Sequence, residues 1–186
     1  MSAGEQTAGL GLLRGTVSVK PHSTEWDAAG RQTAAHLKAL LGDAAADIQH
    51  IGSTAVRSIC AKPIIDFAVG VTAFDAVLSK NELLAAHGFR FRGSDLPGQY
   101  LYVCGDGDII THHIHAVMYQ SKEWNNYLNL RDYLNCHEAD AQAYSALKER
   151  LAAEYPADRI TYTGRKSEWI RGTLRKAEAW RKGGAV

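Results

Sequence analysis

Residues 47–71 have the sequence DIQHIGSTAVRSICAKPIIDFAVGV, in which two apolar runs flank a Gly-Ser turn. Asp66 lies inside the second run, where a charge is costly unless another group pairs with it or binds it. Gly52 and Ser53 follow the first run, and a Gly-Ser turn after a strand can bring backbone N–H groups close to a phosphate. This stretch predicts a strand, a turn and a second strand with a carboxylate at its centre.

The second run, residues 63–71, divides into two faces if it is a strand. Ile65, Phe67 and Val69 share one face with Val71, and this face is apolar enough for the core. Asp66 shares the other face with smaller residues, among them Ala68. We expect that face to form the floor of a cleft.

The rest of the chain alternates helical and extended patterns. Strands are expected at 15–20, 47–51, 63–71, 89–92, 99–104 and 109–119, and helices at 24–41, at 72–88 and over most of 121–182, including 165–181. The GDGD at 105–108 predicts a hairpin turn. These patterns predict an α/β (α+β) fold: one domain over 15–186 after a disordered tail at 1–14, with a mixed sheet and flanking helices over 15–120 and a C-terminal helical part over 121–182.

The composition is that of an ordinary globular protein. The chain has 186 residues, 46% of them hydrophobic, and a net charge of +1, so no nucleic-acid or membrane partner is expected. Three scattered cysteines favour a reducing, cytoplasmic location over a disulfide scaffold. No apolar stretch is long enough to span a membrane, and nothing in the sequence predicts an oligomeric state.

The Gly-Ser turn and Asp66 together suggest nucleotidyl transfer. In that chemistry a Gly-Ser turn, here Gly52 and Ser53 with Thr54 after them, holds a triphosphate, while strand carboxylates hold divalent metal ions. The usual second carboxylate is absent, because position 68 is Ala. An ordinary turn is the competing interpretation, since short motifs often match by chance.

The stretch THHIHAV at 111–117 is the second unusual feature. On a strand His113 and His115 point the same way, and His112 points the other way. Two imidazoles near Asp66 could bind a metal, bind phosphate, or act as acid or base. Alternatively, they are hydrogen-bonded histidines on a half-exposed strand.

Several other polar residues are candidates for the same cleft. His50 could orient the turn or line the cleft, and Lys62 could neutralise phosphate or pair with Asp66. Arg131 could form a buried ion pair or clamp an anion. Lys166 is a further anion-binding candidate, together with Lys148 and Arg165, although basic residues on helix surfaces usually have no such role.

The chain resembles the GrpB-like family of the nucleotidyltransferase superfamily. The resemblance rests on HIGSTAV at 50–56, AKPIIDFAVGV at 61–71, HHIHAV at 112–117, RDYLNCHEADAQAYSALKERLA at 131–152 and RKSEWI at 165–170. A similar domain is fused to some actinobacterial dephospho-coenzyme A kinases, but the kinase P-loop is not present in this sequence. Members commonly have Pro-Gly where this chain has Arg57-Ser58, a departure that could alter the loop over the substrate.

The resemblance implies a nucleotidyltransferase-like core with C-terminal helices over one side of the cleft. It also implies that Gly52, Ser53 and Asp66 occupy the positions of the phosphate-binding turn and the first metal-binding acid. His115, with His113, falls where other superfamily members carry a third acid.

Three hypotheses about function follow. The first is an enzyme that transfers a nucleotidyl group from a nucleoside triphosphate to a small-molecule acceptor with Mg²⁺ or Mn²⁺, or a variant in which Asp66, His113 and His115 bind a transition metal. The second is a catalytically degenerate module that binds a nucleotide or another anion. The third is an interaction domain that uses the helical half and binds no ligand.

Overall fold

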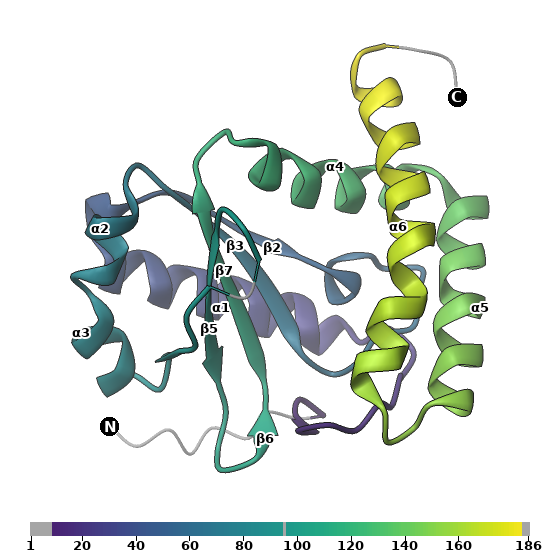
Figure 1. The fold of residues 1–186 in the computed structure, drawn as a ribbon, viewed down its shortest axis with the longest axis horizontal. Helices are drawn as coiled ribbons and strands as arrows, with labels where there is room; N and C mark the ends of the chain where they lie inside the picture. Colours follow the sequence, from purple (N-terminus) through teal and green to yellow (C-terminus); the bar gives the residue numbers. More distant parts are fainter. Residues whose placement is uncertain (1–8, 95, 184–186) are drawn as a thin grey trace.

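The protein is built around a mixed five-stranded sheet (Figure 1). The computed structural model describes residues 9–94 and 96–183. The strands of this sheet follow the order β2-β3-β7-β5-β4 and span Ala45–Ile51 (β2), Ile65–Val71 (β3), Arg90–Phe91 (β4), Gln99–Cys104 (β5) and His112–Met118 (β7). β3 and β7 run parallel, and the other neighbours are antiparallel. The predicted fold class is confirmed.

Helices cover both faces of the sheet. They span Thr24–Leu41 (α1), Phe74–Leu78 (α2), Asn81–Ala86 (α3), Lys122–Cys136 (α4), Glu138–Glu154 (α5) and Arg159–Arg181 (α6). On one face, Leu37 of α1 and Leu84 of α3 pack in the main core with Phe67. On the other face, Trp124 of α4 packs against Ala68. Within the described residues, no helix is both long and apolar enough to cross a membrane.

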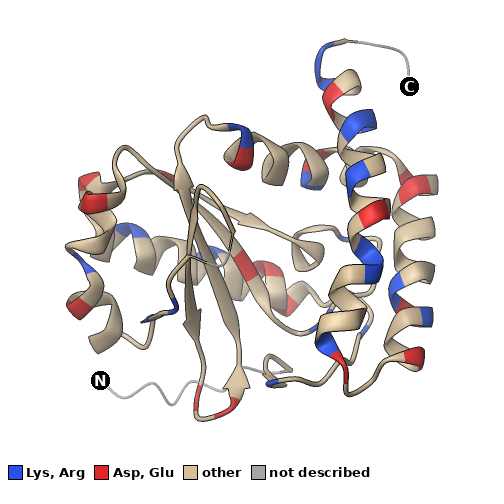
Figure 2. Ribbon diagram, in the orientation of Figure 1, with Lys and Arg blue, Asp and Glu red and all other residues tan. Residues whose placement is uncertain are grey.

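The last two helices extend the fold beyond the sheet. α5 and α6 lie side by side at one end of the sheet (Figure 1). They pack on the segment between β2 and β3, where Val56 and Ile59 join a buried cluster with Tyr144 of α5 and Ala177 of α6. Figure 2 shows Lys and Arg residues along much of α6, whereas the strands carry few charges. A cationic helix therefore stands next to the end of a largely apolar sheet.

The N-terminal predictions are wrong in part. Leu12–Leu13 form a short strand, β1, which pairs antiparallel with Ile109–Ile110 (β6), so residues 9–14 are not a loose tail; residues 1–8 lie outside the described part. No strand forms at 15–20 apart from a single bridge between Lys20 and Ala61, because the N–H of Val17 bonds the carbonyl of Pro156 instead of a neighbouring strand.

Three other element boundaries differ from the prediction. The helix expected at 72–88 is two short helices, because the Ser79 hydroxyl bonds the Ala76 carbonyl at 2.8 Å and ends α2. The strand expected at 109–119 is divided at Thr111, whose N–H and hydroxyl both bond the Cys104 carbonyl. The last helix begins before residue 165, since the Asp158 carboxylate accepts the N–H of Thr161 at 3.0 Å.

The register of the central strands brings the predicted polar residues together. β3 pairs with β7 so that Asp66 lies opposite His113, and it pairs with β2 so that Asp66 lies opposite Ile51. The two faces of β3 are those expected from its period of two: Ile65, Phe67, Val69 and Val71 are in the main core. Asp66 faces a pocket, but Ala68 on the same face is covered by α4.

Candidate ligand-binding site

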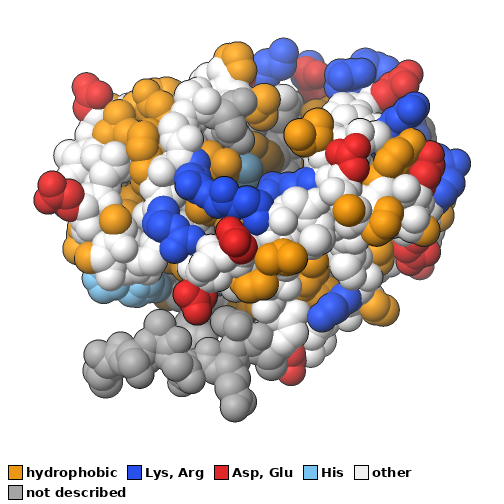
Figure 3. Space-filling model, turned by 60° about the horizontal axis from the view of Figure 1, so that its bottom comes forward, with side chains coloured by type: hydrophobic (Ala, Val, Ile, Leu, Met, Phe, Trp, Pro, Cys, Tyr) orange, Lys and Arg blue, Asp and Glu red, His pale blue; other side chains and the backbone are white. Residues whose placement is uncertain are grey.

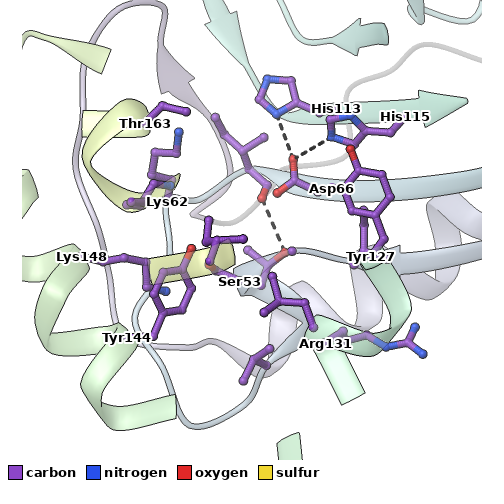
Figure 4. Close-up of a pocket in the computed structure, with 18 of the residues that line it drawn as sticks. Ser53, Lys62, Asp66, His113, His115, Tyr127, Arg131, Tyr144, Lys148 and Thr163 are labelled. Atoms are coloured by element: carbon purple, nitrogen blue, oxygen red, sulfur yellow. Dashed lines mark hydrogen bonds and ion pairs between the residues drawn. The ribbon is translucent and has the colours of Figure 1, made fainter. Parts of the chain in front are cut away.

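A pocket of about 380 Å³ lies between the end of the sheet and helices α5 and α6. Two sets of polar residues face each other across it (Figure 4). The sheet wall consists of Gly52, Ser53, Asp66, His113 and His115, and the cationic wall consists of Lys62, Lys148, Arg159 and Lys166. Figure 3 shows Lys and Arg side chains gathered around this hollow.

Gly52 is required by the close approach of the turn to Asp66. Its φ is +71°, a conformation that residues with a side chain rarely adopt. A Cβ at this position would lie 2.5 Å from Oδ2 of Asp66. The turn continues into a short 3₁₀ helix at Ser53–Ala55. The glycine thus allows the backbone of the turn to reach the carboxylate.

Asp66 is held by both histidines of β7. Nδ1 of His113 lies 2.9 Å from Oδ1 of Asp66, and Nε2 of His115 lies 3.7 Å from the same oxygen. Burial alone would raise the pKa of the Asp66 carboxyl, but the interactions with His113 and His115 outweigh burial and hold the pKa well below its usual range. Asp66 is therefore an anion that the two histidines of the sheet wall stabilise.

This arrangement does not fit the predicted metal site. The two ring nitrogens face one carboxylate oxygen directly, so that oxygen lies where an ion shared by the three side chains would have to lie. Among the described residues, no group of three or more His, Cys, Asp or Glu side chains could hold a metal ion. Within residues 9–94 and 96–183, Asp66 is also the only carboxylate that lines the pocket, whereas Mg²⁺ favours several oxygen ligands.

His50 and Thr54 support the turn. Nε2 of His50 lies 2.9 Å from the Thr54 hydroxyl, and a Cβ on Gly30 of α1 would meet the His50 ring at 2.6 Å. His50 therefore faces α1 rather than the pocket, and burial lowers the pKa of its imidazole to about 4. The structure places His50 against the turn, through its contact with Thr54, and not among the residues that line this pocket; orienting the turn stays a prediction. Thr54 borders the pocket but is almost fully buried.

Arg131 borders the pocket and joins α4 to β2. Its guanidinium donates to the Gln49 side chain at 2.9 Å, to the His50 carbonyl at 3.0 Å and to Asp132 at 2.7 Å. Its side chain points away from Asp66 (Figure 4). The ion-pair alternative is therefore the one that the structure supports. Arg57 and Ser58 line a separate open groove that Arg131 also borders, and neither of them is among the residues that line the pocket.

The cationic wall is organised around Tyr162. Nζ of Lys166 lies 4.4 Å and Nζ of Lys62 lies 5.5 Å from the centre of the Tyr162 ring. Within the part of the chain that the structure describes, neither ammonium group has a carboxylate or hydrogen-bond acceptor. An Arg159 guanidinium nitrogen lies 3.4 Å from Nε2 of His113, and Lys148 donates to the Cys60 carbonyl.

The lysines of this wall repel one another. Burial, followed by the nearby positive charges of Lys62 and Lys148, lowers the pKa of Lys166 to about 7. Burial and the charge of Arg159 lower the pKa of Lys62 to about 8. Burial lowers the pKa of Lys148 to about 8 as well. An anion in the pocket would relieve this repulsion and favour the charged forms.

The remaining lining is largely apolar. Leu130 and Leu134 of α4 and Ile170 of α6 border the same pocket. Tyr127 of α4 lies beside His115, with ring centres 5.2 Å apart. The pocket therefore offers an apolar surface next to two polar walls, a combination typical of small-molecule sites.

A comparison with known protein families shows to which family the chain belongs. The profile of the family described as GrpB protein matches residues 16–176. The chain belongs to the GrpB family. Among solved structures it is similar to the conserved protein GrpB from Enterococcus faecalis, with a TM-score of 0.82 and 29% identity over 88% of this chain and 99% of that chain. The resemblance expected from the HIGST, KPIID and RDYL segments is confirmed.

Curated relatives show the same relationship. The Glutamate-rich protein GrpB of Alkalihalophilus pseudofirmus is 33% identical and is matched over 87% of this chain and 95% of its own length. The UPF0157 protein YqkA of Bacillus subtilis is 32% identical over 90% of this chain, which spans about half (49%) of that relative. A weaker likeness to the Cid1 poly(U) polymerase, with a TM-score of 0.49 and 15% identity, is too slight to inform the function.

Sequence reasoning named Lys62, Lys148 and Lys166 as candidates for binding an anion but left Arg159 out of the site. No sequence pattern indicated a role for Arg159, because the last helix was expected to begin only at residue 165. Lys148 did lie in such a pattern: it follows Tyr144 by one helical turn and precedes Leu151 by three residues, on the side of α5 that is buried. A lysine in that pattern is a sign of a buried cation. Arg165, by contrast, is exposed and does not line the pocket.

Proposed function

We propose that this GrpB-family protein binds a nucleoside phosphate in the pocket between the sheet and α5–α6. The phosphates would lie near the Gly52-Ser53 turn and the cationic wall. The base and sugar would lie toward the apolar side formed by Leu130, Leu134 and Ile170.

The unbalanced positive charge of the cationic wall is the observation that carries the proposal. Lys62 and Lys166 have no carboxylate partner among the described residues, and their pKa values are lowered, so both favour a ligand that brings negative charge. The pocket volume of about 380 Å³ falls in the range of sites for small molecules. A phosphate group attached to an apolar ring system fits both features.

Transfer of a nucleotidyl group to a small-molecule acceptor stays a prediction, as does the cytoplasmic location. A metal-dependent transfer needs carboxylates that the described part of the sheet wall does not supply, since position 68 is Ala and Asp66 already binds two histidines. Binding is the function for which this chain's own residues provide direct support.

Calorimetric titration with ATP, CTP, GTP and UTP tests the proposal, first in EDTA and then with MgCl₂ or MnCl₂. We expect saturable binding of at least one nucleotide and weaker binding of the matching nucleoside, which lacks phosphates. Equal affinity for nucleoside and nucleotide, or no binding in any condition, would contradict it. A pyrophosphate-release assay with the nucleotide that binds then tests whether transfer occurs.

A further inference from the structure

The position of the unpaired cations suggests how the phosphates are neutralised. In a site that depends on a divalent metal, carboxylates hold the ions and the ions hold the phosphates. Here the one described carboxylate of the pocket is bound to His113 and His115, and the other charged side chains of the described lining are lysines and arginines. The charge distribution is thus the reverse of a metal-binding pocket.

Geometry brings three of these cations together. Lys62 precedes β3, and Arg159 and Lys166 lie two turns apart on α6. Lys62 and Lys166 both approach the Tyr162 ring, at 5.5 and 4.4 Å from its centre, and Tyr162 itself is 1% exposed. A buried aromatic ring therefore fixes two ammonium groups from different segments on one side of the pocket.

Arg159 extends the cluster toward the sheet wall. One guanidinium nitrogen lies 3.4 Å from Nε2 of His113, whose Nδ1 is bonded to Asp66. In the neutral imidazole whose Nδ1–H donates to Asp66, Nε2 accepts the N–H of Arg159. The other N–H groups of Arg159 have no acceptor among residues 9–94 and 96–183, so they are available to a ligand.

Lys148 has a structural role within the cationic wall. It is 2% exposed, donates to the Cys60 carbonyl and packs 4.6 Å from the centre of the Tyr144 ring. Its contacts anchor the segment before Lys62 to α5. Its charge adds to the local positive potential, but its geometry is that of a structural lysine.

We propose that Lys62, Arg159 and Lys166 form a polyphosphate subsite that neutralises the phosphates of the ligand in place of a divalent cation. The inference rests on the proposed nucleotide binding and adds that binding needs no metal. It also names the ligand class: a chain of two or more phosphates, because the charge of three cations exceeds the roughly one to two negative charges of a single phosphate ester.

The test is calorimetric titration of the full chain with inorganic tripolyphosphate and with ATP, in EDTA and in MgCl₂. We expect both to bind in EDTA, and binding to weaken in MgCl₂, because Mg²⁺ competes with the lysines for the phosphates. Binding only in MgCl₂ would overturn the metal-free subsite while leaving nucleotide binding intact. No binding under either condition would overturn both proposals. This comparison uses the unaltered protein and does not depend on any variant.

A pair of double variants tests the residues. Lys62→Met with Lys166→Met removes two cations of the subsite, and Arg165→Gln with Arg171→Gln removes two exposed cations of α6 that do not line the pocket. We expect the first to weaken tripolyphosphate binding about a hundredfold, roughly tenfold for each charge-assisted contact, and the second to change it less than about threefold. Equal effects of the two variants would show a general attraction to positive charge and would contradict the subsite.

Folding of the variants is checked by thermal unfolding. If the Lys62→Met, Lys166→Met protein does not fold, Arg159→Gln gives the second measurement, because its guanidinium is the remaining ligand-facing cation. We expect Arg159→Gln to weaken tripolyphosphate binding about tenfold. Unchanged affinity in that folded variant would contradict the subsite.

Discussion

The two walls of the pocket balance their charges in opposite ways. In the sheet wall, the Asp66 carboxylate is satisfied by His113 and His115 without any ligand. In the cationic wall, Lys62 and Lys166 face the pocket with an aromatic ring as their described contact. The sheet wall thus pairs its charged group within the protein, whereas the proposed function assigns the partner of the cationic wall to an anionic ligand.

The largest expected effect is on the turn that closes the sheet wall. Gly52→Ala places a Cβ 2.5 Å from Oδ2 of Asp66 at a φ of +71°. We expect a loss of about 3 kcal/mol in the free energy of unfolding, since strain and steric overlap act together. Chemical denaturation measures this change in the free energy of unfolding.

Gly164→Ala is the matched control for that substitution. Gly164 lies in α6 with no atom within 4 Å of an added Cβ, so alanine should stabilise the helix by up to about 1 kcal/mol. If both substitutions change the free energy of unfolding in the same direction, the predicted contrast between Gly52 and Gly164 is wrong.

The Asp66→Asn substitution distinguishes between two roles of the Asp66 carboxylate, that of a metal ligand and that of a structural anion. Asparagine keeps an oxygen for His113 but removes the negative charge that would repel bound phosphate. We expect tripolyphosphate to bind about fivefold more tightly in EDTA, corresponding to about 1 kcal/mol of removed repulsion. If Asp66 holds a metal that in turn holds the phosphate, the same substitution weakens binding in MgCl₂. Calorimetric titration in both buffers distinguishes these results.

Asp66→Asn also changes the response of stability to pH. The pKa of Asp66 is depressed in the folded protein, so its charge contributes stability above its unfolded pKa of about 4, and that contribution is lost as the pH falls below that value. We expect the parent protein to lose stability between about pH 4 and pH 2 more steeply than Asp66→Asn. Parallel pH dependences of the two proteins would contradict the coupling of Asp66 to His113 and His115.

Lys166→Met should stabilise the protein while weakening anion binding. The folded pKa of Lys166 is lowered to about 7, so the folded state is penalised for its charge below pH 7, and the penalty disappears as the pH rises toward the unfolded pKa of about 10.4. The groups facing Lys166 are Lys62, Asp66, Lys148 and Arg159. We expect Tm to rise at pH 6 by about 2–4 °C, equivalent to about 1 kcal/mol, with a smaller gain at pH 10. A lower Tm at pH 6 would show that Lys166 stabilises the fold.

The smallest effect is expected where a cation already has a carboxylate partner on the surface. Lys182 pairs with Glu178 across one turn of α6 at 2.7 Å, and the Lys182 side chain is 73% exposed. Lys182→Ala should change the free energy of unfolding by less than about 0.5 kcal/mol and leave tripolyphosphate binding unchanged. A change in binding as large as that of Lys166→Met would remove the distinction between pocket and surface lysines.

The sheet wall was predictable because its residues follow a period of two along single strands. Alternation placed Asp66 away from Phe67, and it placed His113 and His115 on one face. The parallel pairing of β3 and β7 then set Asp66 opposite His113. Periodicity could not show that the histidines would use their ring nitrogens on the carboxylate, because side-chain rotation decides that contact.

The cationic wall was harder to predict because it forms between segments distant in sequence. Lys62 and Lys166 meet at Tyr162 only after α5 and α6 pack on the segment that precedes β3. Arg131 shows the same difficulty: its position on a helix face left a buried ion pair and an anion clamp open, and only the packing shows that it bonds Asp132, Gln49 and the His50 carbonyl. Which cation is paired depends on tertiary packing, which local patterns do not encode.

A crystal structure of the protein grown with ATP in EDTA tests the central claim most directly. The account predicts phosphate oxygens about 3 Å from Nζ of Lys62 and Lys166 and from the Arg159 guanidinium, with the Asp66–His113 contact unchanged. A triphosphate held on the Asp66 side, with His113 and His115 displaced from the carboxylate, would contradict it.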